Sequence, residues 1–159
     1  MIRHIWTVAC ERTIIADDGI VSLIAVIDRI ETPVLPLALL TGFSVVSWFF
    51  SDDLDSTVHY RLRCETPNAE SVFDITGQAE FGGFPKSRLV VDLRQVVLKT
   101  PGVHWIVVEI GQEDGALEEV ARIPIEVVLS PAESPSQPSP SQPESPSQPE
   151  SPSQPGDSD

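Results

Sequence analysis

The sequence lacks the short motifs that place catalytic groups in several large enzyme classes. It contains no Gly-x-Ser-x-Gly, whose serine acts as a nucleophile on a strand-to-helix turn. Gly82-Gly83 is followed by Phe84-Pro85 rather than by the start of a helix, so it does not form a phosphate-binding loop. We therefore expect no enzyme activity, no catalytic residues and no cofactor. Paired carboxylates of the glycosidase kind meet only in the fold and leave no recognisable spacing.

Positive charge is also scarce. The 159 residues include 10 Lys and Arg against 24 Asp and Glu, which gives a net charge of −14. Sequence-independent binding to nucleic acid depends on Lys and Arg side chains that displace the counterions of phosphates. Binding to anionic membrane surfaces depends on the same charges. The composition therefore predicts a partner that is neither nucleic acid nor membrane.

Cysteine and histidine are too few and too scattered for a metal site. The two cysteines, Cys10 and Cys64, and the three histidines share no ligand spacing, and His4 and Cys10 would lie about 20 Å apart on one extended strand. The N-terminus has no apolar stretch long enough for a secretory signal, because Glu11-Arg12 follows a short run. We expect a cytoplasmic protein in which both thiols stay reduced and pack as small apolar side chains.

The longest apolar stretch is Pro36–Phe50, which carries no charge. A transmembrane helix needs about 20 apolar residues, and residues 33–50 approach that length. However, the flanks are acidic, only Arg29 is nearby, and Ser, Thr and Pro interrupt the stretch, which argues against a membrane anchor. β-Branched and aromatic residues dominate its second half. We predict a buried strand over 41–50, and we expect Trp48→Asp to unfold the domain by burying an unpaired charge.

Alternation with a period of two residues dominates the first 129 residues, and no segment shows the period of an amphipathic helix. Turn residues, among them Asp18-Gly19, separate the apolar segments. Short strands at regular spacing predict an all-β domain. We expect an antiparallel β-sandwich, immunoglobulin-like or C2-like, with about eight strands; a barrel is the alternative. The predicted strands are 3–15, 20–30, 41–50, 57–65, 71–75, 88–94, 103–110 and 120–129.

The alternation also predicts which side chains face the core. The strand over 20–30 is apolar on both faces, which predicts an interior strand covered from two sides. In the last strand Pro124 lacks an N–H, so this strand is expected at a sheet edge or at a bulge. In the first strand the predicted buried face holds His4, Trp6, Val8, Cys10 and Ile14.

Residues 130–159 differ in composition from the rest of the chain. They are almost entirely Ser, Pro, Gln and Glu, and the unit Glu-Ser-Pro-Ser-Gln-Pro occurs at 133–138, 144–149 and 150–155. Such a segment buries too little apolar surface to offset its ordering entropy. We predict a folded domain over 1–129 and a disordered tail over 130–159, biased to polyproline II, that acts as a solvating spacer rather than as a docking motif.

Parts of the sequence resemble a known family. Residues 5–11 (Ile-Trp-Thr-Val-Ala-Cys-Glu), a short turn and residues 21–24 (Val-Ser-Leu-Ile) resemble the opening of an uncharacterised family of small bacterial β-rich proteins, a domain of unknown function. Residues 88–93 and Pro101-Gly102 followed by a strand are similar to it too. The resemblance implies a bacterial cytoplasmic β-rich domain over residues 1 to about 129 and implies no catalytic role.

Two of the predicted turns are rich in aspartate. In C2-like sandwiches, aspartates on loops at one end of the domain bind calcium, which prefers oxygen ligands. If the first and third strands ran in the same direction, the two turns would form such a site. Aspartate is also common in turns because it accepts hydrogen bonds from its own backbone, and that structural role is the simpler interpretation. The candidate calcium ligands are Asp17, Asp18, Asp52, Asp53 and Asp55.

The sequence has clear alternation of core and surface residues but no motif of catalytic residues, which favours a non-enzymatic binding or structural module. Its loops or an edge strand would contact an unknown protein partner. The alternative is a C2-like domain that binds calcium or a small ligand through its acidic turns. A hydrolase of unfamiliar type ranks last.

Overall fold

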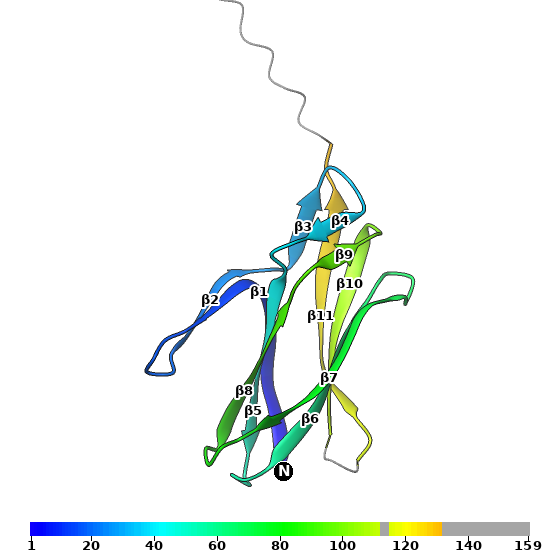
Figure 1. The fold of residues 1–159 in the computed structure, drawn as a ribbon. Coiled ribbons are helices and arrows are strands. Elements are labelled where there is room, and N and C mark those ends of the chain that lie inside the picture. The colour runs from blue at the N-terminus through cyan, green and yellow to red at the C-terminus, as the bar shows by residue number, and fades with distance from the viewer. Residues whose placement is uncertain (112–114, 132–159) are drawn as a thin grey trace, which may run out of the picture.

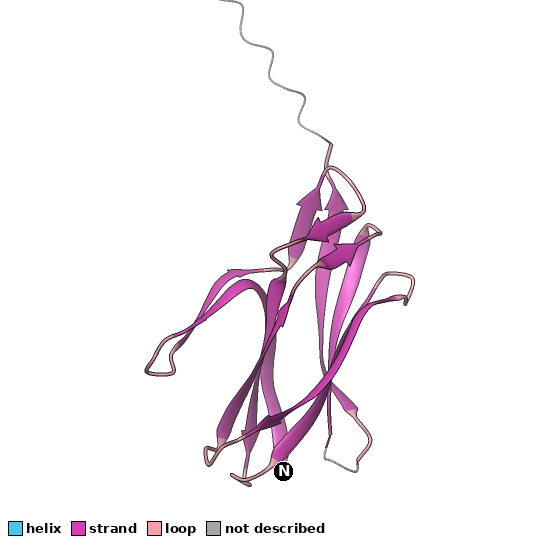
Figure 2. Ribbon diagram, in the orientation of Figure 1, coloured by secondary structure: helices cyan, strands magenta, loops and turns pink. Residues whose placement is uncertain are grey.

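The structure is a computed structural model that describes residues 1–111 and 115–131. Every regular element in these residues is a strand (Figure 2). No helix that could cross a membrane is found in this part of the chain. The strands are β1 (Ile2–Ile15), β2 (Val21–Val26), β3 (Arg29–Thr32), β4 (Leu37–Leu39), β5 (Phe43–Ser51), β6 (Thr57–Glu65), β7 (Ser71–Glu80), β8 (Lys86–Leu93), β9 (Val96–Leu98), β10 (Gly102–Gly111) and β11 (Glu118–Leu129).

The strands form two large sheets and one small one. Sheet A has the order β2-β1-β5-β8 and is antiparallel throughout. Sheet B has the order β3-β11-β10-β6-β7, in which only β3 and β11 are parallel. The strands β4 and β9 form a separate antiparallel pair. In Figure 1 this pair lies at the end of the molecule where β11 finishes, and the N-terminus lies at the other end.

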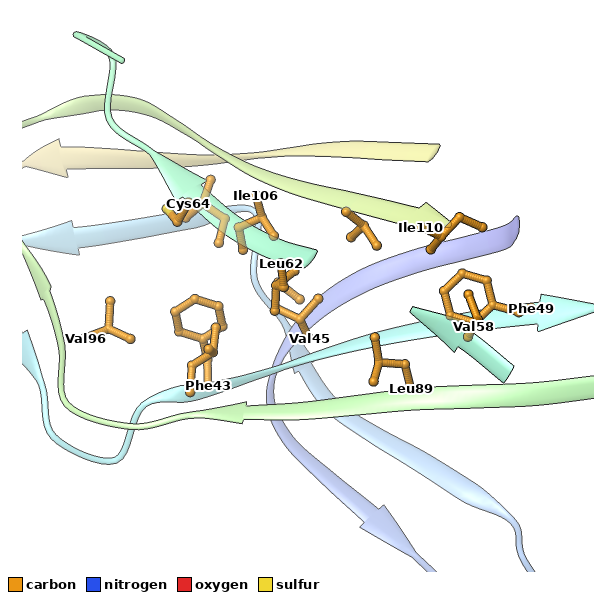
Figure 3. Close-up of a cluster of buried hydrophobic side chains, with 14 of the residues drawn as sticks. Phe43, Val45, Phe49, Val58, Leu62, Cys64, Leu89, Val96, Ile106 and Ile110 are labelled. Carbon is orange, nitrogen blue, oxygen red and sulfur yellow. The ribbon is translucent and has the colours of Figure 1, made fainter. Parts of the chain in front are cut away.

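Sheets A and B share one hydrophobic core between their inner faces. Alternate residues of β5 supply Phe43, Val45 and Phe49, while Leu62 and Ile106 approach from sheet B (Figure 3). Phe49, Leu62 and Ile106 are completely buried. Burying a side chain of this size stabilises the fold by about 1.5–3 kcal/mol. The buried strand predicted over 41–50 is therefore confirmed, and it lies inside sheet A between β1 and β8.

The fold is all-β, as predicted, but it has eleven strands in the described residues instead of about eight. The predicted strand over 20–30 is two strands, β2 in sheet A and β3 in sheet B. The prediction that it is an interior strand is wrong, because β2 and β3 each lie at the edge of a sheet and Val26 is 62% exposed. The strands β4 and β9 were not predicted, because each has only three residues and all three are apolar, which leaves no alternation of apolar and polar residues to detect.

The face predicted for the first strand is also wrong, because β1 contains an irregularity. Its register against β5 shifts between His4 and Trp6, which inserts one extra residue, Ile5. A one-residue shift moves every following side chain to the other face. Ala9 therefore packs in the core, whereas Trp6, Val8 and Cys10 lie on the outer face of sheet A.

Pro124 lies at a position in β11 where no neighbouring strand needs a hydrogen bond from its backbone nitrogen. It is opposite Trp105 of β10, and β3 pairs with β11 only from Glu126 onward. The earlier part of β11 has no second partner strand in the described residues, so Pro124 lies at a locally open edge, although β11 as a whole lies between β3 and β10 rather than at the edge of the sheet. The predicted disordered tail falls almost entirely on residues 132–159, which lie outside the described part of the chain.

Candidate functional site

The structure does not bring the five candidate calcium ligands together. β1 and β5 are antiparallel and Ile2 lies opposite Ser51, so the turn after β5 is beside the start of β1. Asp17 and Asp18 instead follow the far end of β1. No group of three or more His, Cys, Asp or Glu side chains that could hold a metal occurs in residues 1–111 and 115–131. The assumption that the first and third strands run in the same direction is wrong.

The aspartates in these turns accept hydrogen bonds from nearby backbone N–H groups, as expected if their role is to stabilise the turns. Asp18 Oδ1 accepts a hydrogen bond from the Ile20 N–H (3.0 Å), and Asp53 Oδ1 accepts one from the Asp55 N–H (3.2 Å). Asp52 pairs with the guanidinium of Arg3 at 3.3 Å. These contacts shape turns and tie the N-terminus to β5, so calcium binding by any one of the turns stays a prediction without geometric support.

A chain of polar side chains lies on the inner face of sheet A and resembles part of a catalytic relay. His4 Nε2 is 2.7 Å from Thr7 Oγ1, which is 2.8 Å from Ser47 Oγ. Ser47 is only 1% exposed, so its hydroxyl has no access to a substrate in this structure. Burial also lowers the pKa of His4, whose ring edge meets Phe49. The chain satisfies buried polar groups, which is its evident structural role.

The two cysteines are both buried, as expected for small apolar side chains. Cys64 packs in the core, and burial raises the pKa of its thiol to about 12. Cys10 lies on the outer face of sheet A and its Sγ is 3.4 Å from Thr13 Oγ1. A thiol held in its protonated form is a poor nucleophile and a poor metal ligand, so Cys64 supplies no chemistry.

The outer face of sheet A carries the most distinctive surface of the molecule. Register places Trp6 opposite Trp48, which in turn is opposite Arg88, and the next row holds Val8, Val46 and Val90. We call the following group the tryptophan face: Trp6, Val8, Val46, Trp48, Lys86 and Arg88.

Two stacked indoles form the centre of the tryptophan face. The rings of Trp6 and Trp48 are 3.9 Å apart between centroids and 14° from parallel. Trp6 is 41% exposed and Trp48 is half-buried, so part of the stacked pair remains open to solvent. Beside them, the guanidinium of Arg3 lies 4.9 Å from the centre of the Phe50 ring. A charged group introduced at position 48 would not enter the core, which removes the reason to expect Trp48→Asp to unfold the domain.

Two cations flank the aromatic surface without an acidic partner. Lys86 and Arg88 line a shallow recess of about 300 Å³ together with Trp48 and Ser87. Neither forms an ion pair with a carboxylate of the described residues. Arg88 Nη1 donates a hydrogen bond to the Gly19 carbonyl at 2.7 Å, which holds the tip of the β1–β2 hairpin against this face.

On the outer face of sheet B, in contrast, the cations are paired with carboxylates. Arg61 binds Asp74 at 2.6 Å and lowers the pKa of that carboxyl group. Arg122 contacts Glu119 at 2.9 Å and Glu65 at 3.1 Å. Arg63 is likewise paired with Glu65 and with Glu109, the latter at 3.1 Å. The arginines on sheet B are therefore paired with carboxylates, whereas Lys86 and Arg88 have no carboxylate partner in the part of the chain that the structure describes.

Sequence reasoning missed the tryptophan face for a physical reason. β5 is apolar on both faces, so alternation could not tell which of Trp48 and Phe49 points into the core. The sequence does carry one signal, because Lys86 and Arg88 fall on the opposite face of β8 from Leu89. Since β8 pairs with β5, the face of β5 beside these two cations is the outer face of the sheet.

These features define an all-β domain of two facing sheets with an exposed aromatic and cationic surface. The chain belongs to a family of unknown function (DUF6941), whose model matches residues 5–128. This match confirms the resemblance to an uncharacterised family and assigns no activity. No curated protein and no solved structure matches the chain.

Proposed function

We propose that the chain is a non-enzymatic β-sandwich module that binds a protein partner through the tryptophan face. One observation carries the proposal: exposed Trp6 stacks on half-buried Trp48 at the outer face of sheet A, beside two cations that have no carboxylate partner among the described residues. Trp and Arg are the residue types that most often dominate the energy of protein interfaces. The recess beside Trp48 gives such an interface a place for an anchoring side chain.

The chemistry of this surface favours an acidic, extended partner segment. The aromatic rings offer a flat apolar platform, and Lys86 and Arg88 offer charge to a carboxylate that lies across the recess. Nucleic acid would also complement these cations and stack on the rings. The net charge of −14 disfavours that partner, because a phosphate backbone carries one charge per nucleotide and would be repelled along its length.

The proposal is tested by cross-linking in the native host with wild type and two charge-reversal variants of the full chain. The test variant is K86E/R88E. The matched control is K99E/R94E, which has the same change in net charge at two other exposed cations without ion-pair partners in the described residues. Each cross-linked protein is then purified and titrated against the three forms.

We expect one partner to bind wild type and the K99E/R94E control with similar affinity and to bind K86E/R88E at least tenfold more weakly. Equal affinity for both variants would place the interface elsewhere and overturn the proposal. So would loss of binding in both, which indicates a long-range charge effect. A single-stranded oligonucleotide titrated in parallel tests the rival class of partner, and tighter binding to the oligonucleotide than to any protein would reverse the assignment.

A further inference from the structure

We infer that the tryptophan face is occupied, in the absence of an external partner, by the chain's own C-terminal tail, which replaces the spacer role expected from its composition with a docking role. This inference rests on the proposed function, because it names the first occupant of the same surface. The tail, residues 130–159, holds nine of the 15 prolines, five acidic residues and no Lys or Arg. Its charge is thus complementary to Lys86 and Arg88, which have no carboxylate partner among the described residues, and its prolines suit an aromatic platform.

The repeat contains a dipeptide that matches the recess. Where one unit meets the next, a proline directly precedes a glutamate, as in Pro143-Glu144 and Pro149-Glu150. A proline ring packs on the indole of Trp48 in the way that polyproline ligands dock on aromatic grooves. The adjacent carboxylate then lies within reach of Lys86 and Arg88, the two cations that line the same recess.

The length of the tail is sufficient for this contact. β11 ends at Leu129, at the end of the molecule opposite the N-terminus (Figure 1). Trp6 is near the N-terminus, so the tail must run back along roughly one strand length; a strand of 12 residues like β11 spans about 40 Å. The 19 residues from Pro131 to Pro149 span at most about 60 Å when extended, which is long enough to pass around the edge of the sheet and reach the recess.

A weak contact is enough because the tail is tethered. A short flexible linker gives an effective concentration of the order of 1 mM. A segment that binds with a millimolar dissociation constant would therefore occupy the face about half of the time. An external acidic segment would compete with the tail for the same surface, so the tail would lower the apparent affinity for such a segment.

The test uses the indole N–H signals in nuclear magnetic resonance spectra of the full chain. Trp6 and Trp48 report on the tryptophan face, and Trp105 on sheet B is an internal reference. The test variant removes both proline–glutamate junctions, and a matched control removes the same number of prolines and charges further along the tail. These variants are P143A/E144Q/P149A/E150Q and P152A/P155A/D157N/D159N.

At low ionic strength we expect the signals of Trp6 and Trp48 to move in the junction variant and to superpose on wild type in the control, with Trp105 unchanged in both. A synthetic peptide of residues 144–155, added at about 1 mM, is expected to move the junction variant's signals back. Tenfold dilution of wild type should change nothing. A shift on dilution would instead assign the contact to the tail of a second copy and overturn the intramolecular form.

Superposed spectra of wild type and the junction variant, with no response to the peptide, would overturn the inference. That outcome is distinguishable from failure of the proposed function. If K86E/R88E still loses its protein partner, the face is an interface that the tail does not occupy. If K86E/R88E keeps its partner, the interface itself is refuted whatever the tail does.

Discussion

Two neighbouring residues of β5 test whether the two faces of sheet A are assigned correctly. Phe49 is completely buried between the sheets, whereas Trp48 is half-buried and stacks on Trp6 at the outer surface. Phe49→Ala leaves a cavity that the core refills only in part, so it should lower the free energy of unfolding by about 3–5 kcal/mol. Trp48→Ala loses one aromatic pair and part of a surface contact, which is worth about 1–2 kcal/mol.

Thermal and urea denaturation of the full-length variants measure this difference. For a folded part of about 130 residues, 1 kcal/mol corresponds to about 4 °C in Tm, so Phe49→Ala should lower Tm by about 10–20 °C and Trp48→Ala by about 4–8 °C. Trp48→Asp should remain folded, because its carboxylate would lie beside Lys86 and Arg88 rather than in the core. Equal losses for the two alanine variants, or an unfolded Trp48→Asp, would refute the assignment of Trp48 to the outer face.

Three further predictions concern single sites. Gly42→Ala should destabilise the domain by several kcal/mol, because the added Cβ would lie 1.6 Å from the Leu93 carbonyl oxygen. Gly82 is also at positive φ but has open space around it, so Gly82→Ala should cost only about 1 kcal/mol. Similar losses of Tm in the two variants would contradict the predicted clash at Gly42. Burial lowers the pKa of His4 in the folded chain, so below about pH 6.5 the unfolded chain binds more protons and stability falls; His4→Gln should therefore lose less Tm than wild type between pH 7.5 and 5.5, and parallel Tm profiles would count against it. The thiol of Cys64 should stay unreactive toward Ellman's reagent at pH 8 until urea unfolds the chain, because burial raises its pKa to about 12; rapid labelling of the folded Cys10→Ala variant would show that the thiol is accessible.

Sequence periodicity predicted the strands that alternate and failed where the backbone departs from regular geometry. The segment 57–65 has one apolar face and became β6 with the predicted bounds, with Val58, Leu62 and Cys64 buried. The turn at Asp18-Gly19 also holds, with Gly19 at φ 82°. The extra residue at Ile5, by contrast, reverses every later side chain of β1, and no pattern of apolar and polar residues marks such an insertion.

The site was less accessible to prediction than the fold, because it depends on which strands become neighbours. Trp6 and Trp48 are far apart in the sequence, and only the antiparallel register of β1 and β5 stacks them. The acidic turns illustrate the converse. The two turns were grouped on the assumption that the first and third predicted strands run in the same direction. The observed pairing of Ile2 with Ser51 instead places the two turns at different ends of β1.

The apolar stretch of β5 is richer than the fold alone needs, and this excess supports a binding role for its outer face. An antiparallel sheet requires one apolar face to cover the core, and Phe43, Val45 and Phe49 supply it. Trp48 forms an aromatic pair with Trp6 that stabilises the fold by about 0.5–1.5 kcal/mol, and this stabilisation is sufficient to explain why the two rings stack. Lys86 and Arg88 are not part of that stack, and neither has a carboxylate partner in the described residues. The arginines on the outer face of sheet B pair with carboxylates of the chain, and an acidic occupant of the tryptophan face would supply the corresponding pairing on sheet A.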